Sequence, residues 1–147
     1  MRFAWGFDEE DERCHAMKLE LMQQIMFLRQ QGVSQFMVAC DPGVGLYAAE
    51  AVNVLRQDDP ELMLFCVAPY EEQATKWMPE LRERYFDMLI QCTRMTAVSL
   101  QKRTGAQLDA YQSIIDQSDV VLAVYDPTSA CGDDVDQAMS YARDKRR

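Results

Sequence analysis

The residues best suited to chemistry lie in a glycine-rich turn, "DPGVG", between an apolar run and an amphipathic one. Gly43 and Gly45 permit positive φ and close backbone approach, and the following helix start offers unpaired N–H groups and the positive end of its dipole to an anion. The full G-x-G-x-x-G pattern is absent, because Ala48 stands at its last position. The same turn is equally a tight corner in which Asp41 accepts hydrogen bonds locally and Pro42 is rigid.

Four carboxylates, "DEED", form a second candidate group at the start of the first predicted helix. Acidic side chains favour the positive end of a helix dipole, and Asp8 can serve as the N-cap. We interpret this group as a solvated capping turn whose charge would repel a phosphate at the neighbouring strand end. His15 follows Cys14, but the sequence places no acid or nucleophile beside it, so it predicts no Cys-His catalytic pair.

Short apolar runs alternate along the chain with longer amphipathic ones, which is typical of βαβ units and a mostly parallel sheet. The predicted strands lie near 2–6, 34–40, 62–68, 95–100 and 119–125. The predicted helices lie at 10–31, 46–57, 71–92, 107–118 and 133–146. We therefore expect an α/β fold of three layers with a mostly parallel five-stranded sheet, the first strand flanked by the second and the last.

The apolar patterns indicate how these elements pack. The runs "LMLFCVA" and "VVLAVY" are continuously apolar, as expected of central strands covered on both faces. Two predicted helices carry apolar stripes that we assign to the core: Cys14, Met17, Leu21, Ile25 and Leu28 in the first, and Trp77, Leu81, Tyr85 and Met88 in the third. No linker or low-complexity segment interrupts the pattern, so residues 1–147 are expected to form one domain.

Composition narrows the classes of function. The 147 residues carry 15 Lys and Arg against 24 Asp and Glu, a formal net charge of -9, which argues against nucleic acid as the main partner. The chain has neither an apolar run of about 18 residues nor a secretory leader pattern, so we expect no membrane association and a cytoplasmic location. Five cysteines, one histidine and no C-x-x-C pair disfavour zinc and disulfide frameworks, and Cys40 and Cys66 are expected to be buried free thiols without metal.

Ligands of open parallel sheets bind beyond the carboxyl ends of the strands. Four loops are predicted there: "GFDEED", "DPGVG", "APYEEQATKW" and "YDPTSACGD". The stretch "GVGLYAAEAVNVL" is similar to a Gly-Val-acid-Leu-Trp-Ala-Ala-Glu pattern, and "APYEEQATKW" is similar to Pro-Phe-x-x-Gln-x-x-x-Trp. With "IDQSDVVLAVYDP", these stretches resemble the YpsA-like family, a branch of the SLOG superfamily of Rossmann-like proteins that also includes DprA and the cytokinin-activating LOG enzymes. The resemblance runs from Arg2 to about Ala142.

The resemblance implies a Rossmann-like, bacterial-type protein that binds or senses a nucleotide-derived ligand, such as ADP-ribose or NAD, more readily than it catalyses a reaction. The binding site that it implies comprises Gly6, Gly43, Val44, Gly45, Glu50, Gln73, Trp77, Asp126 and Gly132. Two of these have structural alternatives, because Gln73 can cap the turn after the third strand and Trp77 can pack in the core.

The chain departs from the family pattern where polar ligand anchors are expected. Gly45 replaces an acid, Trp5 to Asp8 replace Thr-Gly-x-basic, Ala110 and Tyr111 replace a basic residue and Asn, and Cys131 to Asp133 replace Gly-Gly-Thr. The change at Gly45 removes the acid expected to contact the ligand, and each of the other changes removes a donor or adds negative charge. We therefore expect a partly degenerate or retuned nucleotide site.

Other functions remain open at this stage. A ligand-free interaction module on the same scaffold is the main alternative, and ten Met residues permit an adaptable surface. A LOG-like nucleotide hydrolase is less favoured, because the chain lacks the Pro-Gly-Gly-x-Gly-Thr-x-x-Glu loop. A DprA-like single-strand binder is opposed by the net charge. The sequence also leaves open a homo-oligomer.

Overall fold

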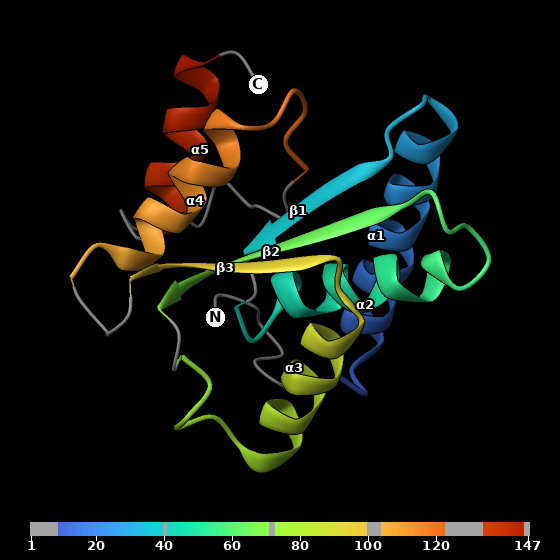
Figure 1. The fold of residues 1–147 in the computed structure, drawn as a ribbon, viewed down its shortest axis with the longest axis horizontal. Helices are drawn as coiled ribbons and strands as arrows, with labels where there is room; N and C mark the ends of the chain where they lie inside the picture. Colours follow the sequence, from blue (N-terminus) through green and yellow to red (C-terminus); the bar gives the residue numbers. More distant parts are fainter. Residues whose placement is uncertain (1–8, 40, 71–72, 100–103, 123–133, 146–147) are drawn as a thin grey trace.

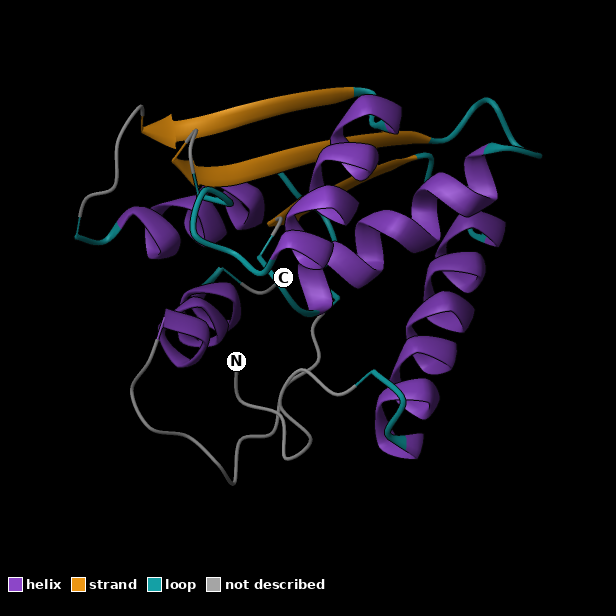
Figure 2. Ribbon diagram, turned by 90° about the horizontal axis from the view of Figure 1, so that it is seen from below, coloured by secondary structure: helices purple, strands orange, loops and turns teal. Residues whose placement is uncertain are grey.

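A parallel sheet of three strands lies at the centre of the computed structural model (Figure 1), which describes residues 9–39, 41–70, 73–99, 104–122 and 134–145. The strands are β1 (Gln35–Ala39), β2 (Met63–Tyr70) and β3 (Arg94–Ser99), in the order β1-β2-β3. Figure 2 shows them side by side and pointing the same way, as both parallel ladders require. Their carboxyl ends therefore meet at one edge of the sheet.

Helices cover the sheet from two sides. They are α1 (Glu12–Gln30), α2 (Val44–Arg56), α3 (Pro79–Gln91), α4 (Ala106–Asp116) and α5 (Asp134–Asp144). Figure 1 shows α2 and α3 below the strands and α4 and α5 above them, while α1 packs on α2 and runs steeply across the strand direction. None of these helices is long and apolar enough to cross a membrane within the described residues.

The period of two in the strands explains why the sheet needs helices on both faces. Leu64 and Cys66 on β2 belong to the main core cluster with buried residues of α1, α2 and α3. Their neighbours on the adjacent strands, Phe36 opposite Leu64 and Met95 opposite Cys66, pack against the same cluster. Val67, which alternates with them, is also buried, and α4 contacts this strand. A continuously apolar β2 is thus the consequence of two covered faces, as predicted.

The predicted α/β class and parallel sheet are confirmed, but the described residues contain three strands and not five. The predicted strand at 2–6 lies outside the described residues, as do positions 123–125 of the last predicted strand. Residues 119–122 are described and form no strand. Val120 is 57% exposed and Leu122 is 41% exposed, so this apolar stretch lacks the cover that a central strand would have.

Two predicted helix starts are wrong. The third helix was expected to begin near residue 71, but α3 begins at Pro79. A proline forces the preceding residue out of the helical region, and Met78 accordingly has φ -54° and ψ 140°. The first helix is capped by Asp11, whose side chain accepts the Arg13 N–H at 2.9 Å, rather than by Asp8, which lies outside the described residues.

Candidate functional site

The glycine turn after β1 is closed by Asp41 folding back onto the start of α2. The carboxylate Oδ1 of Asp41 accepts the N–H of Gly45 at 2.9 Å. Its backbone carbonyl accepts the N–H groups of Gly43 at 2.8 Å and Leu46 at 3.1 Å. Val44 is left as the residue of this turn whose N–H has no acceptor in the part of the chain that the structure describes. The turn therefore has the geometry of a tight corner, and it offers an anion the single N–H of Val44 in place of a set of N–H donors.

Gly45 is required by steric contact in this turn. A Cβ built on Gly45 would lie 1.7 Å from the carbonyl oxygen of Ala39 and 2.1 Å from Oδ1 of Asp41. No side chain fits there while the strand end and the carboxylate keep their positions. The glycine that stands where the family pattern has an acid therefore follows from the way Asp41 is placed.

Asp41 is an unusual carboxyl group at the carboxyl end of the sheet. Its Oδ2 accepts the hydroxyl of Tyr111, from α4, at 3.3 Å. Burial raises the pKa of Asp41 above its ordinary value, while the hydrogen bonds from Gly45 and Tyr111 oppose that rise. Sequence reasoning treated Asp41 only as a turn acceptor and Tyr111 only as a lost polar anchor. An acid directly after a strand and before a glycine turn was the available signal.

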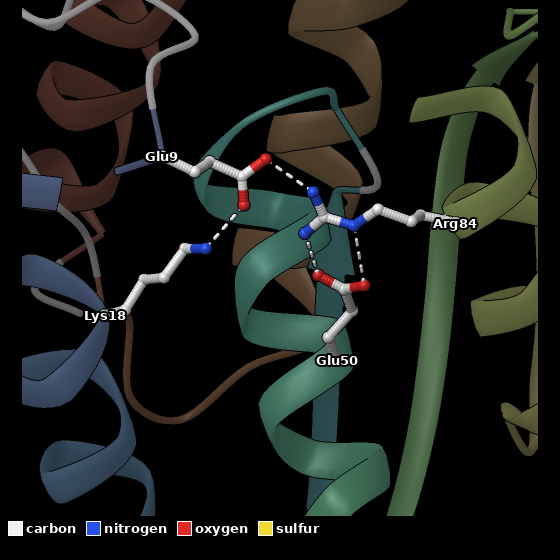
Figure 3. Close-up of polar contacts among 4 residues, drawn as sticks. All are labelled: Glu9, Lys18, Glu50 and Arg84. Carbon is white, nitrogen blue, oxygen red and sulfur yellow. Dashed lines mark hydrogen bonds and ion pairs between the residues drawn. The ribbon is translucent and has the colours of Figure 1, made fainter. Parts of the chain in front are cut away.

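Glu50, predicted to contact a ligand, is paired with Arg84 of α3 (Figure 3). Both oxygens of Glu50 accept from the guanidinium, at 2.6 Å from Nη2 and 3.1 Å from Nε. The remaining Nη1 of Arg84 lies 2.5 Å from Glu9, and the other oxygen of Glu9 lies 2.5 Å from Nζ of Lys18 on α1. This four-residue network ties the segment before α1 to three helices, so Glu9 is not the freely solvated carboxylate that the sequence suggested.

The network also sets the charge states of its members. The hydrogen bonds that Arg84 donates to Glu50 raise the pKa of Arg84, so its charge is fixed. Burial raises the pKa of Glu9, but hydrogen bonds and charges from Arg84 and Lys18 outweigh burial and hold that pKa below its ordinary value. Lys18 Nζ lies 4.4 Å from the centre of the Tyr47 ring, and burial raises the pKa of that phenol to about 12.

Gln73 and Trp77 meet on Tyr85, the neighbour of Arg84 in α3. Gln73 is buried, and its Nε2 donates to the Tyr85 hydroxyl at 3.1 Å. The rings of Trp77 and Tyr85 have centroids 5.0 Å apart. The structure thus brings Glu50, Gln73 and Trp77 to one helix, where each supports packing or charge pairing.

The other predicted site residues are placed less fully. Gly6, Asp126 and Gly132 lie outside the described residues, so their ligand contacts stay a prediction. Within the described ranges no three His, Cys, Asp or Glu side chains gather in a way that would hold a metal ion. Cys66 is a buried free thiol, as predicted, whereas Cys40 is not described.

Replacing Gly45 by Ala should destabilise the protein by about 3 kcal/mol, the upper end of the usual cost of overpacking, because the added methyl group collides with the Ala39 carbonyl. Gly32→Ala is the matched control, since Gly32 has open space around its Cβ position but a φ of +98°, which costs about 1 kcal/mol of backbone strain. Urea unfolding of both variants measures the difference. Equal losses would contradict the steric explanation.

The Asp41→Asn variant should change how stability depends on pH. A carboxyl group whose folded-state pKa is raised above 3.8 contributes stability below that value and loses it as pH rises through the folded pKa. The free energy of unfolding of Asp41→Asn, relative to the unmodified protein, should therefore increase as pH rises from about 4. Asp58→Asn removes an exposed carboxylate and serves as control. A constant difference across pH 4–8 would rule out a raised pKa.

Replacing Arg84 by Met should lower the free energy of unfolding by about 1–2 kcal/mol, because it leaves the half-buried Glu9 and Glu50 carboxylates without their shared partner. Arg82→Met removes a single hydrogen bond to the Thr75 carbonyl and should cost less than about 0.5 kcal/mol. Denaturant unfolding at low and high salt compares the two, and the loss at Arg84 should shrink with salt. A loss no greater than that of Arg82→Met would show that the network contributes nothing to stability.

Comparisons with known proteins match nearly the whole chain to one family. Residues 3–146 match the family YpsA, described as the YspA SLOG family. The chain is 33% identical over 106 residues to the UPF0398 protein BH1768 of Halalkalibacterium halodurans, a match covering 71% of this chain and 56% of that protein. It is 26% identical over 123 residues to the UPF0398 protein YpsA of Bacillus subtilis, covering 82% of this chain and 68% of the relative.

The matches extend to other bacteria at the same level. A UPF0398 protein of Ligilactobacillus salivarius is 25% identical over 123 residues, which cover 82% of this chain and 67% of that protein. The chain thus spans little more than half of BH1768 and about two thirds of the other two relatives. Because the family match covers nearly the whole chain, this protein belongs to the YspA SLOG family.

Proposed function

We propose that this protein binds or senses a nucleotide-derived ligand, such as ADP-ribose or NAD, without catalysis, and that it recognises the ligand at the carboxyl end of β1 around Asp41. The observation that carries the proposal is a carboxyl group with a raised pKa at this edge of a parallel sheet. Perturbed carboxyl groups gather at functional sites, and ligands of parallel sheets bind at this edge.

Asp41 is chemically suited to hydroxyl groups more than to phosphate. A carboxylate has about four acceptor positions, and the N–H groups of Gly45 and of Asp41 itself and the hydroxyl of Tyr111 occupy part of them. The contact to Tyr111 is long at 3.3 Å, so a ribose hydroxyl can compete for it. A phosphate would meet the carboxylate's charge and only the N–H of Val44. We therefore place the ligand's sugar, and not its phosphates, at Asp41.

Binding should be measured by thermal shift with ADP-ribose, NAD, AMP, adenosine and inorganic phosphate at millimolar concentration. At 100 times Kd a ligand adds about 2.7 kcal/mol of stability, which is a shift of roughly 5–11 °C for a domain of this size. We expect ribose-containing compounds to shift the transition and inorganic phosphate to leave it unchanged. If no nucleoside or nucleotide shifts the transition by a degree, the nucleotide proposal fails.

Asp41→Asn is the variant that tests the role of the carboxylate. Its amide oxygen can still accept the Gly45 N–H, so the turn is retained while the charge is lost. In Asp41→Asn, the apparent affinity for ribose compounds, obtained from the thermal shift, should fall at least tenfold. The control Asp58→Asn, which removes an exposed carboxylate of the same type, should bind as the unmodified protein does. Equal affinity of the two variants for ribose compounds would show that Asp41 does not contact the ligand.

The second candidate is an interaction module that has lost its ligand. It is favoured by the contacts of Glu50, Gln73 and Trp77, which pair with or pack on Arg84 and Tyr85 of α3. On this reading the family-like residues hold α3 in place and contact no ligand. Failure of the whole ligand series in thermal shift would favour the module.

A further inference from the structure

The side-chain amide of Gln107, in the first turn of α4, is a buried donor without an acceptor. Its Nε2 is closed off from solvent, and the part of the chain that the structure describes provides no hydrogen-bond partner for it. Within the same ranges no other buried side-chain nitrogen or oxygen lacks a partner. A buried polar group that makes no hydrogen bond costs free energy, so a residue that keeps one requires an explanation.

Gln107 lies close to the candidate site. β3 ends at Ser99 and α4 begins at Ala106, so the first turn of α4 follows the carboxyl edge of the sheet. α4 packs on all three strands, on the face opposite α2 and α3 (Figure 1). Residues 107 and 111 are neighbours on a helix surface, with side chains about 40° apart around the axis and Cβ atoms about 5–6 Å apart. Gln107 is therefore next to Tyr111, whose hydroxyl lies 3.3 Å from Oδ2 of Asp41.

The positions of the apolar residues of α4 show which flank carries the amide. Ala106 and Ala110 are buried where the helix meets the sheet, and Leu108 and Ile115 pack with α5. Counted around the helix, Gln107 falls between these two surfaces, on the same side as Tyr111. The unpaired nitrogen is thus on the flank from which α4 reaches Asp41.

An unpaired amide near a carboxyl group suits a ligand that presents a donor and an acceptor close together. We propose that Gln107 is a recognition residue of this site, whose amide donates a hydrogen bond to one ribose hydroxyl while the neighbouring hydroxyl donates to Asp41. The inference rests on the function proposed above and extends it, because it names the vicinal diol of the ribose as the group recognised. Gln107 was not among the residues that the family resemblance implied.

The vicinal hydroxyls of a ribose match the chemistry of the two side chains. Each hydroxyl donates one hydrogen bond and accepts others, so one can serve the carboxylate while the other accepts from the amide. A phosphate has acceptors for the amide but is repelled by the carboxylate. A 2′-deoxyribose keeps one of the two hydroxyls, and its complex would leave a buried polar group of the site unpaired. A site of this kind rejects the analogue that lacks the hydroxyl.

Gln107→Leu tests this role, because it keeps the approximate size of the side chain and removes its donors. Titration calorimetry on the full chain, with adenosine and 2′-deoxyadenosine, measures both affinities. The unmodified protein should prefer adenosine by about tenfold or more, and Gln107→Leu should bind adenosine about tenfold more weakly and lose the preference. Gln112→Leu is the matched control, since it changes a glutamine of α4 on the flank away from Tyr111 and should bind both compounds as the unmodified protein does.

The stability of the protein without ligand is the second measurement. Leucine at position 107 fills similar space with no unpaired donor, so the melting temperature of ligand-free Gln107→Leu should rise by roughly 2–4 °C. An amide that serves the fold would instead lower it when removed. A variant that is more stable yet binds more weakly is the expected result for a residue retained for a ligand.

The outcomes separate this inference from the proposed function. If the unmodified protein binds no ribose compound, both fail. If Asp41→Asn weakens the binding of adenosine and Gln107→Leu does not, the site at Asp41 stands and the role of Gln107 is overturned. Equal losses of adenosine and 2′-deoxyadenosine affinity in Gln107→Leu would overturn recognition of the diol, and a lower melting temperature of the ligand-free variant would overturn the unpaired amide.

Discussion

The return of the Asp41 side chain onto the start of α2 is the interaction on which the strand-end turn depends. It satisfies the Gly45 N–H, brings Oδ1 against the Cα of Gly45, and places Oδ2 against Tyr111 of α4. One carboxyl group thereby joins β1, α2 and α4. Burial of this carboxyl group raises its pKa, while the hydrogen bonds that close the turn oppose the rise. Positions 41 and 45 consequently cannot vary independently, because an acid at 45 requires a different course for residue 41.

A second group of contacts, on α3, accounts for Glu50, Gln73 and Trp77, which were predicted as site residues from the family pattern. Arg84 holds Glu50 by a bidentate pair, and Tyr85 receives Gln73 and Trp77. Side chains that look like ligand anchors in the sequence therefore act together in positioning one helix. The turn at Asp41 and the contacts on α3 are made by different side chains, although the stretch from Asp41 to Glu50 contributes to both.

Much of the fold followed from local pattern. The runs that form β1, β2 and β3 were located because short apolar runs between turn residues are typical of buried strands. In α1, Cys14, Leu21 and Ile25 are buried, as their helical spacing predicted. The start of α3 was missed because the apolar spacing before Pro79 outweighed the proline's effect on Met78.

Contacts between distant residues were beyond such reasoning. The sequence around Arg84 does not indicate that it pairs with Glu50, 34 residues away. The sequence around Asp41 likewise does not indicate a contact with Tyr111, 70 residues away. The sequence therefore located the turn and Asp41 as its local acceptor, but not the contact of Asp41 with Tyr111. Such pairings depend on how helices cross the sheet, which local periodicity does not encode.

The ion pair between Glu9 and Arg84 has a consequence for the order of folding. The two residues are 75 positions apart, so the pair closes a long loop, whereas the Glu50 pair closes a shorter one between helices that already share a core. The entropy of loop closure makes the longer contact the later one to form. The segment that carries Glu9 should accordingly open and close on its own while the core stays folded, and amide hydrogens near the start of α1 should exchange with solvent sooner than those of β2.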